Sequence, residues 1–396
     1  MNMELRTLAE RLGIAEYPEE LNEIYGAVRN GAPIGGITET LTALEKDYAP
    51  FDKYYDFLMR AAEEILADEA LHLWLTLGVA YCKNAGEKEA ARFPLPPSNE
   101  TLARDLFPAI LIAMEYPETI KRYRAYGFDE AQIKKNLGNL GINLSVHELT
   151  QGRVALSAGL YAWMVHYAKA RIFDHAGFNF QASKWGDETI LLKNKESGAL
   201  AFLMLKGSFA ADGRVAGIRG AEDVPALFDA AVEETEDAFF GYRAQNQRVH
   251  TERECFPKSE WEAVLRPCDD VISFHLPRGT NLTPDHVERA MAEGEALARR
   301  FYTDCDFKQI VCISWMLDPK LLDILPEHSN ISQFIRHFIL HPSGDTAGVA
   351  GMGYVWPGVN CPIEELPENT SLQRGIKSMM LGGKYLFWTA GVWVKK

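Results

Sequence analysis

Most of the first 145 residues follow the apolar spacing of α-helices. Through residues 49–84, apolar side chains recur every three or four positions, which places them on one side of a helix. The stretch 93–99 (FPLPPSN) contains three prolines and predicts a connector, after which the helical spacing resumes over 102–114. A further helix is expected over 151–170. The pattern therefore predicts an all-α N-terminal region.

Beyond residue 170 the pattern changes to short runs of β-forming residues. Residues 178–184 predict a strand, and the runs 189–193 and 200–205, joined through the turn-forming letters KESG, predict a β-hairpin. A short helix is expected over 224–239 and a strand over 242–254. This change indicates a second region of mixed secondary structure.

The clearest unit of this second region is a strand, a helix and a second strand. The first strand is expected over 271–276 (VISFHL), followed by the loop 277–282 (PRGTNL). Thr283 is a good N-cap, and the proline after it suits the first position of a helix that extends to about residue 301. The second strand is expected over 310–317 (IVCISWML). This order is a βαβ unit, whose two strands should run parallel.

Composition and charge narrow the class of protein. The chain has 396 residues, of which 47% are hydrophobic, and this length predicts two or three globular domains. Its formal net charge of −14 argues against general binding to nucleic acid or to an anionic membrane, because both need basic surfaces. No apolar stretch is long enough for a membrane helix, and the first residues do not resemble a signal peptide. The six cysteines are scattered without a CxxC pair, which favours reduced thiols in the cytoplasm and lacks zinc-ligand spacing.

The start of the helix inside the βαβ unit has features of an anion site. The first N–H groups of a helix lack intrahelical partners and lie at the positive end of its dipole. Arg278 adds a cation just before this helix, Gly279 lets the backbone approach a ligand, and Thr283 begins the helix. These features are typical of a phosphate or pyrophosphate cradle. The alternative is an ordinary capped connection, because the carboxylate of Asp285 could satisfy the same dipole.

Polar and apolar residues alternate in both strands of the βαβ unit. Ser273 and His275 share one face of the first strand, and Cys312 and Ser314 share one face of the second. If these faces align, the four side chains line a cleft at the carboxyl ends of the strands, where open α/β sheets bind ligands. His275 is the candidate base, because an unperturbed imidazole titrates near neutral pH, and Ser314 is a candidate donor to substrate. The alternatives are a core histidine bonded to backbone and an ordinary strand serine.

Three segments carry a resemblance to a known family. RIFDHAGFNFQASKWGDETILL, ISFHLPRGTNLTP and CISWMLDPKLLDILPEHSNISQF resemble bacterial proteins that pair a helical N-acyltransferase N-terminal domain with a GNAT-like C-terminal domain. The resemblance covers nearly the whole chain. It implies a helical domain over 1–148 and a GNAT-like domain with a mixed sheet over 149–396. It also implies that the strand 271–275 holds the acyl group and that the loop from Leu276 to Asn281 holds acyl-CoA.

The loop departs from the family pattern. GNAT proteins usually carry [Q/R]xxGx[G/A] here, whereas this chain has PRGTN with a single glycine. The side chains of Thr280 and Asn281 could replace some of the missing amide donors. GNAT enzymes also often use a tyrosine after the second strand to protonate the leaving thiolate, and no tyrosine occurs in 312–342. Both departures favour an alternative function, a non-catalytic GNAT-like binding module that has lost CoA chemistry.

The sequence therefore predicts an α+β protein with an all-α N-terminal domain and a GNAT-like α/β domain. The resemblance implies direct transfer of an acyl group from acyl-CoA or acetyl-CoA to the amine of a small-molecule acceptor, with the helical domain as one wall of the acceptor site. No metal, nucleic acid or membrane is expected as a partner, and the oligomeric state stays open. The residues expected to bind the donor are Leu276, Arg278, Gly279, Thr280, Asn281 and Thr283.

Overall fold

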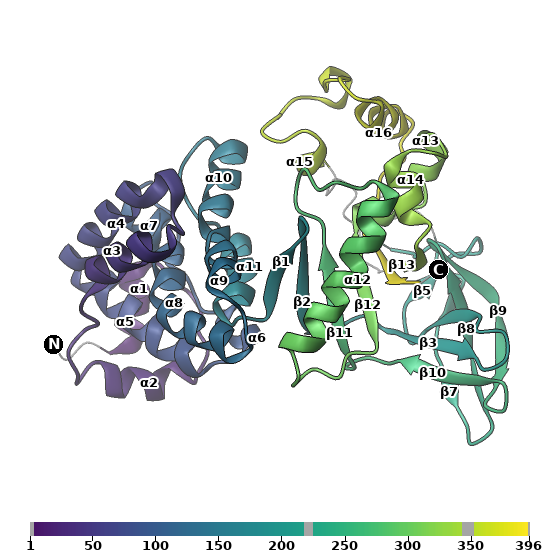
Figure 1. Ribbon diagram of the computed structural model, residues 1–396, viewed down its shortest axis with the longest axis horizontal. Helices are drawn as coiled ribbons and strands as arrows, with labels where there is room; N and C mark the ends of the chain where they lie inside the picture. Colours follow the sequence, from purple (N-terminus) through teal and green to yellow (C-terminus); the bar gives the residue numbers. More distant parts are fainter. Residues whose placement is uncertain (1–3, 218–224, 343–351, 395–396) are drawn as a thin grey trace. The chain divides into compact units, whose positions relative to one another are not determined.

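The protein contains an all-α unit followed by a unit of sheets and helices. A computed structural model describes residues 4–217, 225–342 and 352–394. The chain divides into two compact units, Met1–Asp174 and His175–Lys396. Figure 1 shows only helices in the first, apart from the start of β1, and helices with β-sheets in the second. This confirms the predicted α+β class.

The compact units divide after residue 174, and the domain boundary predicted after residue 148 stays a prediction. A boundary after residue 148 would fall inside helix α10 (Asn139–Gln151). Helix α11 (Ala158–Ala168) belongs to the first unit because it packs against α8 (Phe107–Ala125). The division therefore follows the packing of α11, which the local sequence pattern does not reveal.

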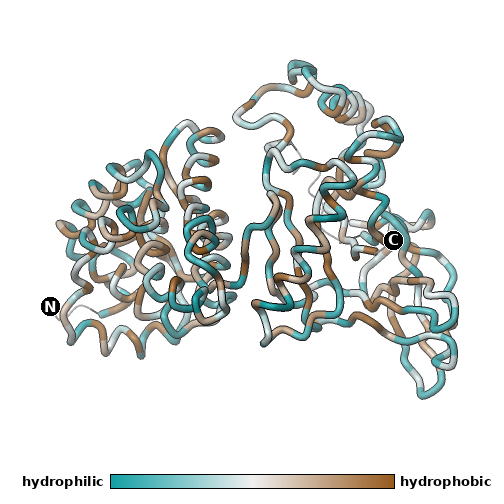
Figure 2. The backbone as a smooth tube through the Cα atoms, in the orientation of Figure 1, coloured by the Kyte–Doolittle hydropathy of each residue, from teal (hydrophilic) through white to brown (hydrophobic). Residues whose placement is uncertain are grey.

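The first unit is built around α8. Most of α8 is buried, including Ile110, Tyr116 and Tyr123, and its first half, FPAILIAM, is apolar on all sides, as expected for a central helix. Hydrophobic and hydrophilic stretches alternate along the other helices of this unit (Figure 2), which is typical of helices with one buried side. The elements besides α8, α10 and α11 are α1 (Leu5–Leu12), α2 (Leu21–Val28), α3 (Ile37–Tyr48), η1 (Asp52–Tyr54), α4 (Tyr55–Ala67), α5 (Glu69–Asn84), α6 (Glu87–Ala90), α7 (Leu102–Asp105) and α9 (Glu130–Leu137).

The helical stretch predicted over 49–84 is broken at Asp68. The Asp68 carboxylate accepts the backbone N–H groups of Ala70 and Leu71 at 2.9 and 3.2 Å, which makes it the N-cap of α5. No single described helix is long and apolar enough to cross a bilayer. The pair on either side of this break reaches that length and composition only jointly and is bent by 109°.

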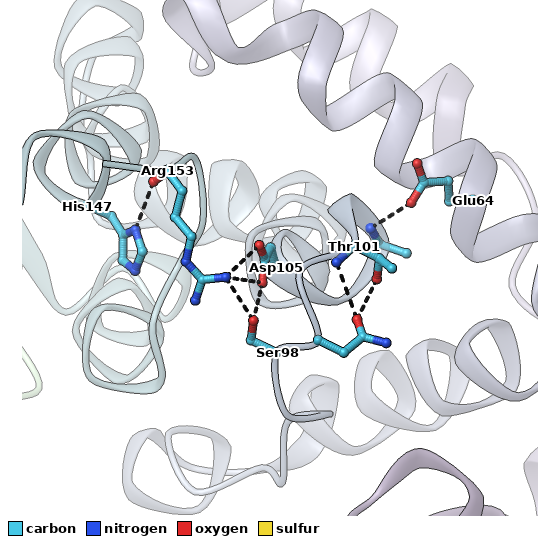
Figure 3. A network of polar contacts seen from close by, with 8 residues as sticks. Glu64, Ser98, Thr101, Asp105, His147 and Arg153 are labelled. Carbon is cyan, nitrogen blue, oxygen red and sulfur yellow. Dashed lines mark hydrogen bonds and ion pairs between the residues drawn. The ribbon is translucent and has the colours of Figure 1, made fainter. Parts of the chain in front are cut away.

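An ion pair joins the end of α7 to the link between α10 and α11 (Figure 3). Nη1 of Arg153 lies 2.9 Å from Oδ2 of Asp105 and donates to Oγ of Ser98 at 2.9 Å. The backbone oxygen of Asp105 accepts the N–H of Leu156 at 3.0 Å. The proline-rich connector is thereby held to the link between α10 and α11. Because Asp105 is buried, loss of its cationic partner would leave a desolvated carboxylate.

The second unit contains two main sheets. The first, called sheet A, has the order β1 (Ile172–His175), β2 (Phe178–Lys184), β11 (Asp270–His275), β12 (Gln309–Ser314), β14 (Thr389–Trp393) and β13 (Phe338–Pro342). The second, called sheet B, has the order β10 (Trp261–Leu265), β3 (Thr189–Asn194), β4 (Leu200–Met204), β8 (Ala238–Gln245) and β7 (Glu233–Glu234), with β9 (Arg248–Pro257) paired to β8. A short ribbon joins β5 (Ser208–Phe209) and β6 (Phe228–Asp229). The remaining elements are α12 (Pro284–Phe301), η2 (Trp315–Leu317), α13 (Leu321–Ile324), α14 (Asn330–Ile335), α15 (Met352–Val355), η3 (Ile363–Glu365) and α16 (Ser371–Leu381).

Sheet B confirms one local prediction and corrects two. The predicted hairpin is β3 and β4, which pair antiparallel. The helix predicted over 224–239 is wrong for its described part, which forms β6 and β7, because pairing with neighbouring strands overrides a local helical pattern. The single strand predicted over 242–254 is a hairpin of β8 and β9, with a positive φ at Asn246 in the turn.

The two faces of sheet A are covered differently. Val271, Val311 and Val392 of sheet A pack in one core cluster with residues of sheet B. The opposite face is covered by α12, where Gly294 lies directly over the ring of Phe180. Sheet A is therefore the central layer between sheet B and α12.

The absence of a side chain at Gly294 permits the close approach of α12 to sheet A. A Cβ atom at this position would lie 2.1 Å from Cζ of Phe180, a buried ring that also packs against Phe274. We expect Gly294→Ala to lower the free energy of unfolding by about 1–3 kcal/mol through overpacking. The matched control is Gly159→Ala in α11, where nothing lies within 4 Å and alanine should stabilise by up to about 1 kcal/mol. Denaturant unfolding of both variants checks this, and a stabilised Gly294→Ala protein would contradict the close contact.

A partly buried aspartate and a fully buried histidine face each other near the junction of the two sheets. His341 of β13 is fully buried against the ring of Phe202, and its Nδ1–H donates to the carbonyl of Pro342 at 2.9 Å. Its Nε2 lies 3.4 Å from Oδ2 of Asp187, and neither atom has a hydrogen-bond partner within the described ranges. Burial lowers the pKa of His341 to about 4. Burial, with the charge of Glu188, raises the pKa of Asp187 to about 6.

Removal of Asp187 and removal of His341 should make the free energy of unfolding depend on pH in opposite directions. Between pH 4 and 6 the folded pair holds one proton on Asp187, and the unfolded pair holds one on the histidine, so the two effects nearly cancel. Asp187→Asn leaves a histidine with a lowered pKa, so stability should fall by about 3 kcal/mol as the pH drops from 6.5 to 4. His341→Gln leaves a carboxyl group with a raised pKa, so stability should fall by about 3 kcal/mol as the pH rises from 4 to 6.

Calorimetric unfolding of the second unit from pH 4 to 7 measures both profiles. The double variant is the control and should return to the flat dependence of the original pair. Single variants that keep the original pH profile would show that the two groups do not titrate as a pair.

Candidate functional site

Strands β11 and β12 run parallel, as predicted, but they stay paired over only part of their length. Their registered pairs are Val271 with Gln309, Ile272 with Ile310 and Ser273 with Val311. Both strands continue beyond this point, and no further pair joins them within the described residues. The outer edge of β11 stays paired to β2, and that of β12 stays paired to β14. The sheet is therefore open between the carboxyl ends of its two central strands.

The register determines which predicted side chains share a face. Because Ser273 lies beside Val311, alternation places His275 on the face of Val311 and Ser314 on the opposite face. The face of His275 is the one that packs toward sheet B near Val271, and the face of Ser314 is the one that packs toward α12. The two polar faces do not align, and the structure does not bring His275 and Ser314 together.

His275 is the last residue of β11 and is partly exposed at the opening. Its Nε2 lies 2.9 Å from Oε1 of Gln181 on β2. An amide oxygen only accepts, so Nε2 carries the proton in this contact. One strand position earlier on the same face, the hydroxyl groups of Ser273 and Ser183 lie 2.7 Å apart. A polar stripe therefore leads along β2 and β11 to the opening.

Ser314 ends β12 and is buried. Its Oγ accepts the N–H of Met316 at 3.1 Å, which caps η2. The hydroxyl proton can still be donated, so the predicted role as a donor stays a prediction. The structure adds a local structural role that the sequence pattern did not indicate.

The chain after η2 is anchored by Asp318, which is fully buried. Its carboxylate accepts the backbone N–H groups of Lys320 at 2.9 Å and Phe387 at 2.7 Å, and it lies 3.0 Å from Nζ of Lys320. The contact with Phe387 links this chain to the segment that enters β14. The carboxylate therefore holds the chain on the β12 side of the opening.

Some polar groups of the loop after β11 already form hydrogen bonds within the protein. Gly279 has a φ of 82°, a left-handed conformation that favours glycine. The hydroxyl of Thr280 donates to the carbonyl of Gly177 at 2.9 Å or of Pro277 at 2.6 Å, so its proton is already used. Oδ1 of Asn281 accepts the N–H of Thr283 at 3.0 Å. The side chains of Thr280 and Asn281 were expected to replace some of the missing backbone donors. Of their groups, only the Nδ2 amide of Asn281 can still donate to a ligand.

The same loop leaves a set of backbone donors and one cation available. Arg278 is exposed and has no ion pair within the described ranges, Leu276 is partly exposed, and Thr283 is an exposed N-cap without a side-chain capping bond. Asp285 places a negative charge in the first turn of α12. Within the loop and the first turn of α12, the backbone N–H groups without a hydrogen-bond partner in the described chain are those of Leu276, Arg278, Gly279, Asn281, Leu282, Asp285 and His286. This arrangement can bind a diphosphate, with Asp285 opposing it.

The turn between β1 and β2 holds this loop in place. Nε2–H of His286 donates to the carbonyl of Ala176 at 2.9 Å, and Thr280 reaches the adjacent Gly177. Both turn residues have positive φ values. Sequence reasoning missed His286 and Gln181 as supporting residues, because no local pattern links 176–181 to a loop a hundred residues later.

A pocket of about 390 Å³ lies beside the loop. It is lined by the loop residues from Thr280 to Leu282, by the turn between α13 and α14, and by the first turn of α16. No cluster of three or more His, Cys, Asp or Glu side chains suited to a metal occurs among the residues described. The site offers backbone donors, one arginine, one imidazole and this uncharged pocket.

The chain matches the sequence profile of one family and is similar in fold to solved acyltransferases. The sequence profile of the family described as GNAT-like C-terminal domain matches residues 187–393. The chain is similar to a solved acyltransferase in complex with decanoyl-CoA, with a TM-score of 0.67, 15% sequence identity and 100% of each chain covered. It is also similar to a mutant acyltransferase in complex with octanoyl-CoA, with a TM-score of 0.65, 16% identity and 99% of each chain covered.

A third similar structure is an acyltransferase in complex with decanoyl-CoA and teicoplanin. Its TM-score is 0.65 and its identity 16%, with 98% of this chain and 99% of that chain covered. No curated protein matches the chain. At these identities the similarity shows a common fold along the chain.

Proposed function

The chain belongs to the family with a GNAT-like C-terminal domain, and we propose on this basis that it transfers an acyl group from acyl-CoA to the amine of a small-molecule acceptor. The observation that carries the proposal is the opening between β11 and β12 beside a loop with unpaired backbone donors. The similar solved acyltransferases, crystallised with octanoyl-CoA or decanoyl-CoA, support it. Acyl-CoA is available in the cytoplasm, which agrees with the expected location.

The donor is bound mainly through backbone N–H groups. The free N–H groups at the start of α12 and in the loop before it hold the diphosphate, and Arg278 adds a charge-assisted contact. Asp285 weakens this attraction, so the site favours a ligand that also makes uncharged contacts. Gly279 has nothing within 4 Å of the place of a Cβ, which leaves room for the ligand beside the backbone.

The chemistry is a direct transfer between two bound substrates. The amine nitrogen attacks the thioester carbonyl, a C–N bond forms, and the C–S bond breaks to release CoA as a thiolate, which takes up a proton. His275 receives the proton lost by the amine, and Gln181 orients its ring through the contact with Nε2. Holding the amine and the thioester in one orientation further increases the rate of transfer over that of the free substrates.

The acceptor is a small molecule with an amine. One similar acyltransferase was crystallised with teicoplanin, which supports a small-molecule acceptor rather than a protein or a nucleic acid. The net charge of −14 agrees with this choice.

A second candidate function is binding of CoA or a small molecule without turnover. It is favoured by the Thr280 hydroxyl, whose proton is used within the protein, and by Asp285 at the anion site. Turnover assays distinguish the two candidates.

Substitution of the proposed base, His275, should lower the rate of acyl transfer without weakening the binding of the donor. We expect the protein to release CoA thiol from decanoyl-CoA in the presence of small amines or teicoplanin, with an N-acyl product seen by mass spectrometry. His275→Gln should lower kcat by about 100-fold or more, with little change in the KM for the donor. The matched control is His250→Gln on β9, an exposed histidine paired with Glu254, which should keep full activity. Donor binding without turnover by the unmodified chain would favour the second candidate, and absence of binding would contradict both.

The contribution of Arg278 can be measured by binding alone. Arg278→Ala should weaken the affinity for decanoyl-CoA by about 5- to 30-fold, the loss of one charge-assisted contact to phosphate. Arg300→Ala, near the opposite end of α12, removes the same charge and should leave the affinity within about twofold. Calorimetric titration checks both values. Equal effects of the two substitutions would mean that Arg278 acts only through long-range attraction.

A further inference from the structure

Three cationic side chains from distant parts of the sequence lie near one another beside the segment that follows β12. Arg214 follows β5, Arg248 begins β9, and Lys320 precedes α13. The positive charges of Arg248 and Arg214 both act on the ammonium group of Lys320. Together these three side chains form the cation cluster.

A tight turn places the two arginines side by side. Nε of Arg214 donates to Oδ2 of Asp212 at 2.7 Å, and Nη1 of Arg248 lies 3.2 Å from the same oxygen. Nη1 of Arg248 also donates to the backbone carbonyl of Asp212 at 2.6 Å. The turn is held on β9, because the N–H of Val249 donates to the carbonyl of Gly213 at 2.8 Å. Two guanidinium groups therefore share one carboxylate.

The segment that enters β14 joins the hairpin of β8 and β9 to Lys320. The amide of Gln247, in the turn of that hairpin, donates to the hydroxyl of Thr389. Two residues before Thr389, the ring centroid of Phe387 lies 4.1 Å from Nζ of Lys320. The N–H of Phe387 donates to the carboxylate of Asp318 at 2.7 Å, and that carboxylate lies 3.0 Å from the same ammonium group.

The cation cluster carries an excess of positive charge. Within the described ranges its arginines pair only with Asp212 and its lysine only with Asp318, so three cations face two carboxylates. Burial lowers the pKa of Lys320, and the charges of the two arginines lower it further against the attraction of Asp318. The side chains of Arg214 and Arg248 are 49% and 57% exposed, so their guanidinium groups can reach a ligand. A small anion among the three groups would offset their mutual repulsion.

The position of the cation cluster favours the acceptor over the donor. An acceptor amine that reaches His275 lies on the face of sheet A that packs toward sheet B. Arg248 belongs to sheet B, and Arg214 follows β5, whose Phe209 packs in the core between the two sheets. The diphosphate of the donor is assigned instead to the start of α12, which covers the opposite face of sheet A.

We propose that the cation cluster of Arg214, Arg248 and Lys320 binds an acidic group of the acceptor, which makes the acceptor an amine that also carries a carboxylate or a phosphate. The planar donors of arginine match two oxygens of either group. The inference rests on the proposed function, which requires an amine as acceptor. It adds a site outside the donor loop and the parted strands, through which a protein with a net charge of −14 can select an acidic substrate.

Chemical labelling of Lys320 tests whether the cation cluster holds an anion. Acetylation by an N-hydroxysuccinimide ester modifies only neutral amines, and a bound anion keeps the amine of Lys320 protonated. Inorganic phosphate or acetate, added at constant ionic strength, should slow the labelling of Lys320 by about threefold or more, as measured by peptide mass spectrometry. Lys308, an exposed lysine labelled in the same sample, should change by less than about 1.5-fold.

Substitution of one arginine should remove this protection. Arg248→Gln should reduce the slowing of Lys320 labelling to less than about 1.5-fold, and Arg214→Gln serves if the first variant does not fold. The matched control is Arg253→Gln on the same strand, whose arginine pairs with Glu233, and it should keep the full protection. Labelling that anions do not slow, or that they slow equally in Arg248→Gln, would overturn the site.

Acyl transfer to matched amines tests the assignment to the acceptor. With decanoyl-CoA as donor, ω-amino acids and ω-aminoalkyl phosphates of increasing chain length are compared with neutral ω-amino amides. At the best length the acidic amine should have a kcat/KM about tenfold or more above that of its neutral match, and Arg248→Gln should reduce this ratio to about twofold. The series with the higher kcat/KM identifies the acidic group as a carboxylate or a phosphate.

The outcomes separate this inference from the proposed function. Equal kcat/KM values for acidic and neutral amines at every length would overturn the acceptor assignment and leave the proposed function intact. Protection of Lys320 by adenosine 3′,5′-bisphosphate at far lower concentration than by phosphate or acetate would assign the cation cluster to the donor and overturn the proposal. Transfer to none of the amines, with Lys320 still protected by anions, would overturn the proposed function and keep the anion site.

Discussion

The structure depends on an interruption of backbone hydrogen bonding between β11 and β12. These strands lie in the middle of sheet A, where backbone N–H and C=O groups normally find partners on both sides. After Ser273 and Val311 the pairing on the inner side ends, while β2 and β14 continue the pairing on the outer sides. An opening in the centre of a sheet leaves polar backbone groups that need a ligand or water. The site is therefore a consequence of strand geometry before any side chain is considered.

The scaffold holds both sides of this opening by different means. On the β12 side, the buried carboxylate of Asp318 joins the chain after η2 to the segment before β14. On the β11 side, the turn between β1 and β2 accepts hydrogen bonds from Thr280 and His286. Behind the strands, Gly294 brings α12 into contact with the ring of Phe180. Each contact joins segments that are distant in the sequence, so the opening is kept by tertiary structure and its width does not depend on the loop alone.

The local electrostatics of the site differ from those of the whole chain. A net charge of −14 makes the protein a poor general ligand for phosphate-bearing molecules. In the loop before α12 and in its first turn, however, seven backbone N–H groups have no hydrogen-bond partner in the described chain, and the same segment carries Arg278 and one opposing carboxylate, Asp285. Backbone donors carry no net charge and keep their direction, so they can select one bound diphosphate in an acidic protein. The same reasoning explains how a loop with one glycine can still serve as a cradle.

The sequence by itself determined the α+β class, the βαβ unit with parallel strands, and the start of α12 after Thr283, because periodicity, helix-start residues and turn residues act over a few positions. It also identified Arg278, Gly279 and His275 as members of the region near the opening. Only the tertiary structure decided that the polar faces of β11 and β12 lie on opposite sides of sheet A, because the register of two parallel strands depends on packing against sheet B and α12. The same holds for the internal use of the Thr280 hydroxyl, for the bond between Gln181 and His275, and for the end of the first unit after α11. Each of these depends on contacts between distant segments, whose energies no local pattern encodes.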